Sequence, residues 1–260
     1  LNGLSDVMDL LPGDFVCSGS GAPESVIEPA DKLMVHNRLP APDNNSMTTS
    51  TAARNNTAVF HEFETHLLGD EKPSVYFDGL LSAGAFPAWP PFDMLSDLKG
   101  VEQSPQHHPE GDVWQHTMLV TDNAAQVKVK SKDPRALMWA ALLHDVGKKP
   151  TTRIRKGRIT AYDHDKVGRE MAERFLRECG QDEAFVRRVG ALVRWHMQAL
   201  YAAKQLPFFN PRAMRAEADI DEVALLCLCD RLGRGPVSVQ QLMQERREIE
   251  NFILKSRRVQ

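Results

Sequence analysis

The amino-acid sequence predicts an all-α protein that carries one small β-hairpin. Between residues 58 and 260, apolar residues recur at helical spacing in one segment after another. One of these segments, residues 135–143, is apolar on almost every side, which is typical of a buried central helix. A single stretch, residues 153–162, alternates with period two around a Lys-Gly pair, and it predicts a hairpin directly after that central helix.

The composition of the chain is that of an ordinary globular protein. The chain has 260 residues, of which 42% are hydrophobic and 26% are charged. The net charge of −3 argues against strong nonspecific nucleic-acid binding by the whole chain, although it allows a local basic face. No apolar run reaches transmembrane length and no signal peptide opens the chain. We therefore expect a cytoplasmic protein that does not enter a membrane.

The chain divides into three parts by composition. Five prolines and two stretches of small polar residues interrupt residues 1–57, so we expect this segment to be poorly structured apart from a short helix over residues 4–11. Residues 58–106 are expected to form a helical lead-in that packs on the main domain. The main helical domain, with its C-terminal helices, is expected over residues 107–260.

Apolar spacing, caps and breakers place the individual helices. The central helix begins after Asp133-Pro134 and is expected to carry His144 and Asp145 on its last turn, to end at Gly147, and to be prevented from continuing by Pro150. The other expected helices cover residues 59–68, 75–85, 94–98, 112–129, 164–179, 183–202, 212–218, 220–232 and 237–254.

Several polar residues interrupt the apolar faces of these helices. A single histidine in such a position is more often a core residue with satisfied hydrogen bonds than a metal ligand, but a larger set of buried polar groups is hard to satisfy without a shared partner. One or two divalent metal ions would satisfy the whole set. Its nitrogen and oxygen donors suit Mn, Ni, Co, Fe or Zn better than Mg alone. The six residues are His116, His144, Asp145, His164, His196 and Asp230.

The order of these residues resembles that of a known family. A histidine, a His-Asp pair and a distant aspartate occur in this order in the HD-domain superfamily of metal-dependent phosphohydrolases, and the run from His144 to Lys148 resembles its central signature. Further stretches are similar to the C-terminal HD portion of bacterial tRNA nucleotidyltransferases, the CCA-adding enzymes. These stretches are residues 70–74, 107–117, 147–151 and 157–164, and the similarity extends over about residues 60–235. The resemblance implies an HD-domain helical bundle.

The sequence also departs from that family. The CCA-adding enzymes carry an N-terminal nucleotidyltransferase domain with a Gly-Ser phosphate motif and paired aspartates on a strand. Residues 1–57 are too short for this domain, and Ser18-Gly19-Ser20-Gly21 is not followed by an Asp-x-Asp pair. We therefore expect a stand-alone HD protein that does not add nucleotides.

The resemblance assigns roles to the candidate residues. His116, His144, Asp145 and Asp230 match the ligands of the superfamily's first metal. His164 and His196 match positions that bind a second metal through a bridging aspartate, here Asp145, or that contact the substrate phosphate and protonate the leaving oxygen. The expected catalytic residues are Lys148, His164, His196 and Asp145, and the expected substrate-binding residues are Lys148, Lys149 and Arg153.

These roles predict an enzyme that hydrolyses a phosphoester with a metal-activated water. The resemblance implies nucleotide or RNA-end phosphoesters such as 2′,3′-cyclic phosphates and 2′-phosphates as substrates, because the similar HD portions handle them. The basic hairpin, with Arg153, Arg155, Lys156 and Arg158, would steer such anions. The alternatives are a di-iron oxygenase of the HD type, because that class uses a similar ligand set, and a non-catalytic RNA-binding or regulatory module. The sequence leaves open whether the protein forms a homo-oligomer.

Overall fold

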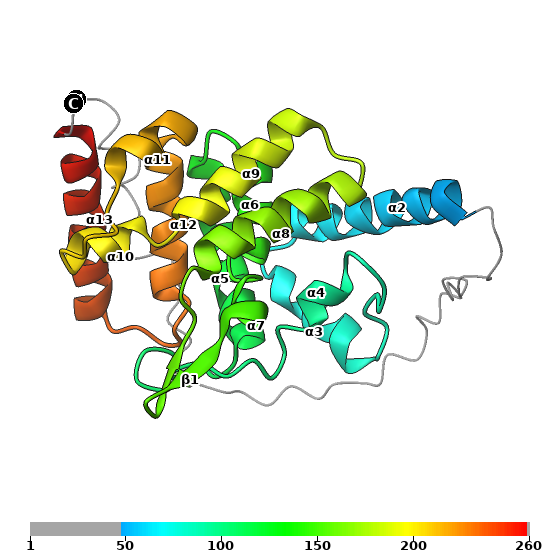
Figure 1. Cartoon of the computed structure of the whole chain (residues 1–260), viewed down its shortest axis with the longest axis horizontal. Helices are drawn as coiled ribbons and strands as arrows, with labels where there is room; N and C mark the ends of the chain where they lie inside the picture. The colour runs from blue at the N-terminus through cyan, green and yellow to red at the C-terminus, as the bar shows by residue number, and fades with distance from the viewer. Residues whose placement is uncertain (1–47, 259–260) are drawn as a thin grey trace, which may run out of the picture.

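The structure, a computed structural model, describes residues 48–258 (Figure 1). Within this range every element except one antiparallel pair of strands is helical, which confirms the all-α prediction. The expected helix over residues 4–11 lies outside the described residues.

The helices form a bundle whose elements follow in this order. The first group is α2 (Thr48–Gly69), α3 (Pro73–Ser82), α4 (Asp93–Ser96), α5 (Val113–Val127) and the 3₁₀ turn η1 (Lys128–Lys130). The middle group is α6 (Pro134–Leu143), α7 (Lys148–Thr151), β1 (Arg153–Arg155), β2 (Arg158–Thr160) and α8 (His164–Glu178). The last group is α9 (Glu183–Trp195), α10 (Gln198–Ala203), α11 (Pro211–Glu217), α12 (Ile220–Leu232) and α13 (Val239–Arg258).

Helix α2 begins earlier than the apolar pattern predicts. The sequence places a helix over residues 59–68, whereas α2 extends from Thr48 to Gly69. Its first turns are rich in Thr, Ser and Asn, which have low helix propensity and carry no apolar stripe, so the pattern gives no helix signal there. The boundary drawn at residue 57 therefore falls inside a helix, and the division of the chain into a lead-in and a main domain stays a prediction.

Helix α6 occupies the centre of the bundle, as its apolar sequence predicts. Residues 136–143 are all buried, and α2, α5, α9 and α12 contact this helix. At its start, the side chain of Asp133 accepts a hydrogen bond from the backbone N–H of Ala136 and caps the helix. On its α2 side, the ring of Trp139 stacks on Phe60 with the ring centroids 4.1 Å apart. This packing fixes the position of the His-Asp pair that follows α6.

The end of α6 differs from the prediction. The helix stops at Leu143, His144 is its C-cap, and a separate short helix, α7, begins at Lys148 and contains Pro150. Gly147 has a φ of −68°, so it does not end the helix in a left-handed conformation. A Cβ atom at Gly147 would lie 2.1 Å from the carbonyl oxygen of His164. Glycine is needed here because the chain passes very close to the start of α8.

The helix expected over residues 183–202 is also interrupted. It consists of α9 and α10, with His196 as the C-cap of α9. The carbonyl oxygen of His196 accepts a hydrogen bond from the thiol of Cys227 in α12, with Sγ 2.8 Å from the oxygen. Since this contact joins residues that are distant in the sequence, apolar spacing could not reveal the break.

The hairpin between α7 and α8 confirms the period-two prediction. Its strands pair antiparallel with Arg153 opposite Thr160 and Arg155 opposite Arg158. Lys156 and Gly157 form the turn with φ values of 50° and 72°, the conformation that two-residue hairpin turns require. In Figure 1 the hairpin extends away from the bundle beside α7.

Candidate metal centre

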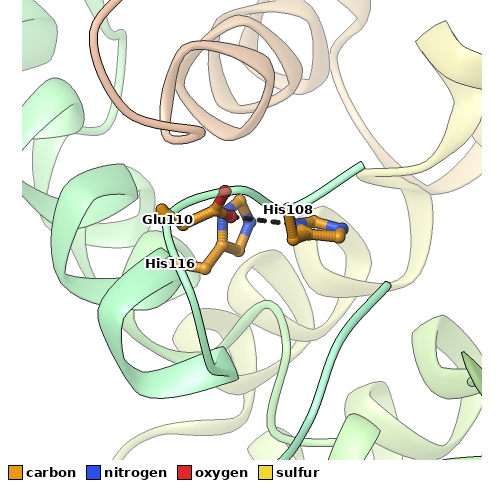
Figure 2. Close-up of side chains that lie close together, drawn as sticks. All are labelled: His108, Glu110 and His116. Atoms are coloured by element: carbon orange, nitrogen blue, oxygen red, sulfur yellow. Dashed lines mark hydrogen bonds and ion pairs between the residues drawn. The ribbon is translucent and has the colours of Figure 1, made fainter. Parts of the chain in front are cut away.

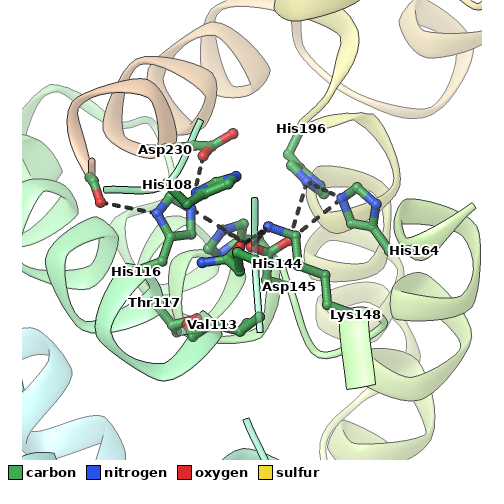
Figure 3. Close-up of polar contacts among 12 residues, drawn as sticks. His108, Val113, His116, Thr117, His144, Asp145, Lys148, His164, His196 and Asp230 are labelled. Atoms are coloured by element: carbon green, nitrogen blue, oxygen red, sulfur yellow. Dashed lines mark hydrogen bonds and ion pairs between the residues drawn. The ribbon is translucent and has the colours of Figure 1, made fainter. Parts of the chain in front are cut away.

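The six residues singled out from the sequence meet in one buried cluster (Figure 3). His116 lies in the first turns of α5, and Asp230 lies near the end of α12. His144 and His196 are C-caps, of α6 and α9, and His164 is the first residue of α8. None of the six side chains belongs to an exposed residue, and His116 is fully buried. Five helices thus direct polar groups toward Asp145.

Backbone carbonyls orient three of the histidine rings in the same way. In each case Nδ1 donates to the carbonyl oxygen three residues earlier. The pairs are His144 with Ala141 at 2.8 Å, His164 with Ala161 at 2.7 Å and His196 with Val193 at 2.7 Å. A neutral ring held by its Nδ1–H keeps the lone pair on Nε2, the arrangement typical of metal-ligating histidines.

Asp145 lies between two groups of nitrogen donors. Its Oδ2 is 3.2 Å from His144 Nε2 and 3.7 Å from His116 Nε2. Its Oδ1 is 3.5 Å from His164 Nε2 and 3.8 Å from His196 Nε2. Each group, taken with Asp145, supplies three donor atoms that lie within 4.8 Å of one another. The two groups, His116-His144-Asp145 and Asp145-His164-His196, share one carboxylate.

Two atoms of this cluster have no hydrogen-bond partner among the described residues. They are His144 Nε2 and Asp145 Oδ1, both buried, whereas Asp145 Oδ2 forms an ion pair with the ammonium group of Lys148 at 2.7 Å. Burial opposes ionisation of Asp145, but His144 and Lys148 beside it hold the pKa of that carboxyl well below its usual range. Orphaned buried acceptors around an ionised carboxylate are costly. A divalent metal ion satisfies them, so the residues fit such an ion.

Carboxylates surround the ring of His116. Its Nε2 donates to Asp230 Oδ1 at 3.0 Å, while Nδ1 donates to the carbonyl oxygen of Gly233 at 3.0 Å and lies 2.9 Å from Glu110 Oε1. Burial lowers the pKa of His116, but the hydrogen bonds to Asp230 and Glu110 outweigh it and raise the pKa to about 9. Both ring nitrogens therefore carry protons in this arrangement. Asp230 contacts His116 but joins neither three-residue group, so its predicted role as a ligand stays a prediction.

His164 and His196 have the opposite electrostatics. Their Nε2 atoms lie 3.3 Å apart. Burial lowers the pKa of both rings, and His164 and His144 lower the pKa of His196 further, to about 4. Both rings are neutral near pH 7, which is the state that a metal requires of a histidine ligand.

The three cations predicted to bind substrate lie in different places. Lys148 is only 9% exposed; its Nζ lies 2.7 Å from Asp145 Oδ2 and donates to Gln103 Oε1 at 2.6 Å. Lys149 is exposed, and its Nζ lies 3.9 Å from Asp97 on the surface. Arg153 is exposed on β1. The structure therefore brings Lys148 into the cluster and leaves Lys149 and Arg153 outside it.

A second group of titratable residues lies at the edge of the cluster (Figure 2); the sequence favours a supporting role over a ligand role for Glu110, and it gave no prediction for His108. His108 Nδ1 lies 2.8 Å from Glu110 Oε1, the same oxygen that approaches His116. Burial raises the pKa of Glu110, but His108 and His116 outweigh this and lower it to about 2. The signal was a His-x-Glu spacing just before the cap residue Asp112, too short a motif to interpret alone. Gln103, the partner of Lys148, gave no sequence signal.

Comparison with known proteins agrees with this geometry. The family model described as HD domain matches residues 113–235, which include all six residues of the cluster. Residues 113–235 are an HD domain.

The curated relatives of this chain are named multifunctional CCA proteins. That of Acidovorax sp. strain JS42 is 32% identical over 183 residues, which is 68% of this chain and 41% of the relative. That of Halorhodospira halophila is 35% identical over 144 residues, or 53% of this chain and 33% of the relative. That of Actinobacillus pleuropneumoniae serotype 5b is 44% identical over 79 residues, or 30% and 18%. The chain therefore spans less than half the length of these relatives.

No helix among residues 48–258 combines the length and the apolar composition that crossing a membrane requires. The cytoplasmic location and the homo-oligomer stay predictions.

Proposed function

We propose that this protein is a metal-dependent phosphohydrolase that acts on nucleotide or RNA-end phosphoesters, with 2′,3′-cyclic phosphates and 2′-phosphates as the leading substrates. One observation carries the proposal. Inside an HD domain, two three-residue groups of nitrogen and oxygen donors share the ionised carboxylate of Asp145, whose Oδ1 has no hydrogen-bond partner among the described residues. This arrangement fits two divalent ions bridged by one aspartate.

The chain's own residues would hold the ions and tune them. His116, His144 and Asp145 would hold one, with Asp230 beside His116, and Asp145, His164 and His196 would hold the other. The mixed imidazole and carboxylate set suits Mn, Fe, Co, Ni or Zn. When bound, such an ion lowers the pKa of a coordinated water and offsets negative charge on phosphoryl oxygens.

Lys148 is the cation best placed to act on the substrate. Its ammonium group is nearly buried, lies beside Asp145, and is held from the other side by Gln103. A positioned ammonium group in a site with little water stabilises the charge that develops on a phosphoryl group more strongly than one in solvent. Lys149 and Arg153, at the surface, would contribute to substrate binding through longer-range attraction.

The lowered pKa values of His164 and His196 support a ligand role over a general-acid role. A general acid works best when its pKa lies near the working pH, whereas the pKa of His196 is lowered to about 4. A neutral ring with its Nε2 lone pair directed at Asp145 is suited to a metal. The proton for the leaving oxygen would then come from water.

The alternatives differ in what they predict. A di-iron oxygenase would use the same two groups, but the buried ammonium of Lys148 beside Asp145 favours an anionic, phosphate-bearing substrate. A non-catalytic module would have no use for orphaned buried acceptors, which are costly to maintain. The expectation that the chain adds no nucleotides stays a prediction.

The test is metal content together with hydrolysis. Protein purified without chelator is analysed for metals and assayed with adenosine 2′,3′-cyclic phosphate and adenosine 2′-monophosphate, as wild type and as H144A/D145A. The matched control is H66A/D70A, which removes a half-buried His-Asp pair outside the cluster, in and just after α2, whose Nδ1 and Oδ2 atoms lie 2.8 Å apart. We expect transition metal and hydrolysis in the wild type and the control, and neither in H144A/D145A.

Other outcomes decide against the proposal. Iron with oxygen-dependent turnover and no phosphate release would establish the oxygenase instead. Equal metal content in H144A/D145A and the control would place the metal elsewhere. If the wild-type protein binds no metal even after reloading, the non-catalytic binding module would be the remaining explanation.

A further inference from the structure

The β-hairpin lies between α7 and α8 (Figure 1), and each of these helices begins with a residue that reaches Asp145. Before β1, helix α7 begins with Lys148, whose Nζ lies 2.7 Å from Asp145. After β2, the carbonyl of Ala161 holds the ring of His164, whose Nε2 lies 3.5 Å from the same carboxylate. A ligand bound along the hairpin therefore has one end next to the cluster.

This hairpin concentrates positive charge that nothing in the described part of the chain neutralises. Residues 148–162 contain six basic residues and no acidic one, although the whole chain has a net charge of −3. Within residues 55–258, no carboxylate lies within ion-pair distance of the four hairpin cations, Arg153, Arg155, Lys156 and Arg158. By contrast, Arg169, Arg177 and Arg231 on the helices each contact two carboxylates.

The register of the strands adds to this charge. Arg155 lies directly opposite Arg158, and like charges opposite one another across two strands are destabilising. A hairpin of two three-residue strands has little else to stabilise it. The pairing is therefore a local cost that binding of an anion would relieve.

An aromatic ring distinguishes nucleic acid from other anions. Tyr162, the residue between β2 and α8 that follows Ala161, is 63% exposed, and the guanidinium of Arg155 lies 5.2 Å from its ring centroid. Ile154 on the same hairpin is 72% exposed. Cations that follow a backbone together with exposed rings on which bases stack are the combination used for single-stranded nucleic acid.

We propose that the hairpin and Tyr162 bind single-stranded RNA and lead its terminal phosphoester to the metal centre, so that the protein acts on RNA ends in preference to free mononucleotides. The placement of the terminal phosphoester at the metal centre, and the choice of RNA over DNA, rest on the proposed function, because 2′-phosphates and 2′,3′-cyclic phosphates require ribose. The binding itself does not rest on it. The cations contact phosphates, and Tyr162 stacks on a base.

The test measures binding separately from turnover. Fluorescence anisotropy follows a fluorescein-labelled RNA octamer with a free 3′ hydroxyl, which carries no phosphoester for the metal centre. The hairpin variant is R155Q/K156N/R158Q, in which Asn tolerates the left-handed backbone at residue 156. The matched control is R174Q/R187Q/R247Q, which removes the same charge from exposed positions on α8, α9 and α13.

We expect the hairpin variant to lose about tenfold or more in RNA affinity at low salt and the control to stay within about twofold of the wild type. The slope of log affinity against log salt should fall by about 2 in the hairpin variant, since each phosphate contact on a single strand contributes about 0.7. Y162A should lose about fivefold or more. Circular dichroism and metal content check that each variant is folded.

The outcomes separate this inference from the proposed function. Equal RNA affinity of the hairpin and control variants would overturn the inference, and so would equal displacement of the octamer by a glutamate octapeptide. An octamer ending in a 2′,3′-cyclic phosphate should be hydrolysed with a higher kcat/KM than adenosine 2′,3′-cyclic phosphate, and the hairpin variant should lose this preference. A protein that binds RNA through the hairpin but hydrolyses nothing would contradict the proposed function alone.

Discussion

His116 and His196 are buried histidines at similar distances from Asp145, yet their pKa values move in opposite directions. Their Nε2 atoms lie 3.7 Å and 3.8 Å from that carboxylate. The pKa of His116 is raised to about 9 by Asp230 and Glu110 against the effect of burial, whereas burial and the neighbouring His164 and His144 lower that of His196 to about 4. The sign depends on whether carboxylates or other rings surround the imidazole.

This difference teaches that the two halves of the cluster start from different protonation states. On the His164–His196 side the rings are neutral and their lone pairs are available to an ion. On the His116 side a proton occupies Nε2 and bonds Asp230, so an ion must displace that proton. Metal loading should therefore be more sensitive to pH at the His116 side.

The largest expected effect comes from removing the carboxylate that both halves share. Asp145→Asn should lower kcat/KM for a phosphoester about 10³-fold or more, because each three-residue group loses a charged ligand. Metal analysis should show loss at both sides. The control is Asp122→Asn, a partly buried carboxylate that accepts hydrogen bonds from Ser74 instead. Retention of full metal content in Asp145→Asn would contradict the shared-ligand arrangement.

The second prediction concerns the pH dependence of stability after chelation. The pKa of His116 lies above its unfolded value of about 6.5. Its contribution to the free energy of unfolding is therefore fully present below pH 6.5 and is lost as the pH rises through about 9. This contribution is roughly 3 kcal/mol. The pKa of His196 is lowered to about 4, so its contribution to the free energy of unfolding is present above pH 6.5 and is lost as the pH falls toward 4. Thermal unfolding between pH 5 and pH 9 should show a maximum near pH 6.5.

A monotonic stability curve over that range would mean that the two halves do not differ in this way. His116→Gln should remove the alkaline decline, and His196→Gln should remove the acid one. An exposed histidine, His61, provides the control, since H61Q should change neither.

The third prediction uses Glu110 to change one half only. Glu110→Gln removes a charge 2.9 Å from His116 Nδ1 and should lower the pKa of that ring by about one unit. The alkaline decline in stability should then be smaller and end at lower pH, while the acid decline stays in place. Glu102→Gln, at an exposed position nearby, is the control. An equal shift of both declines would show that Glu110 acts on the cluster as a whole.

The smallest expected effect concerns the support behind His196. Burial raises the pKa of Cys227 to about 12, so the thiol stays protonated and donates to the carbonyl of His196. Cys227→Ala should lower the free energy of unfolding by about 1 kcal/mol, measured in urea, and Cys227→Ser should recover most of it. The alkaline decline set by His116 should not move. If Ser and Ala were equally destabilising, the hydrogen bond would have no role.

Apolar spacing and turn chemistry predicted most of the fold because both are local signals. The central helix and the hairpin turn at Lys156-Gly157 depend on residues that are close in the sequence. The breaks after Leu143 and after Trp195 were missed because they depend on contacts across the bundle. Gly147 lies against α8, and the carbonyl of His196 bonds Cys227 in α12.

By itself the sequence determined which side chains form the candidate site. Six polar residues on apolar helix faces, in the order of an HD domain, predicted the cluster that the structure brings together. Only the tertiary structure decided how these side chains are charged and paired. It placed the carboxylates of Asp230 and Glu110 within about 3 Å of His116 and, among the described residues, no carboxylate that close to His196. It also buried Lys148 beside Asp145 and left Lys149 and Arg153 at the surface. A pKa and an ion pair depend on distances through space, which the spacing of residues along a chain does not fix.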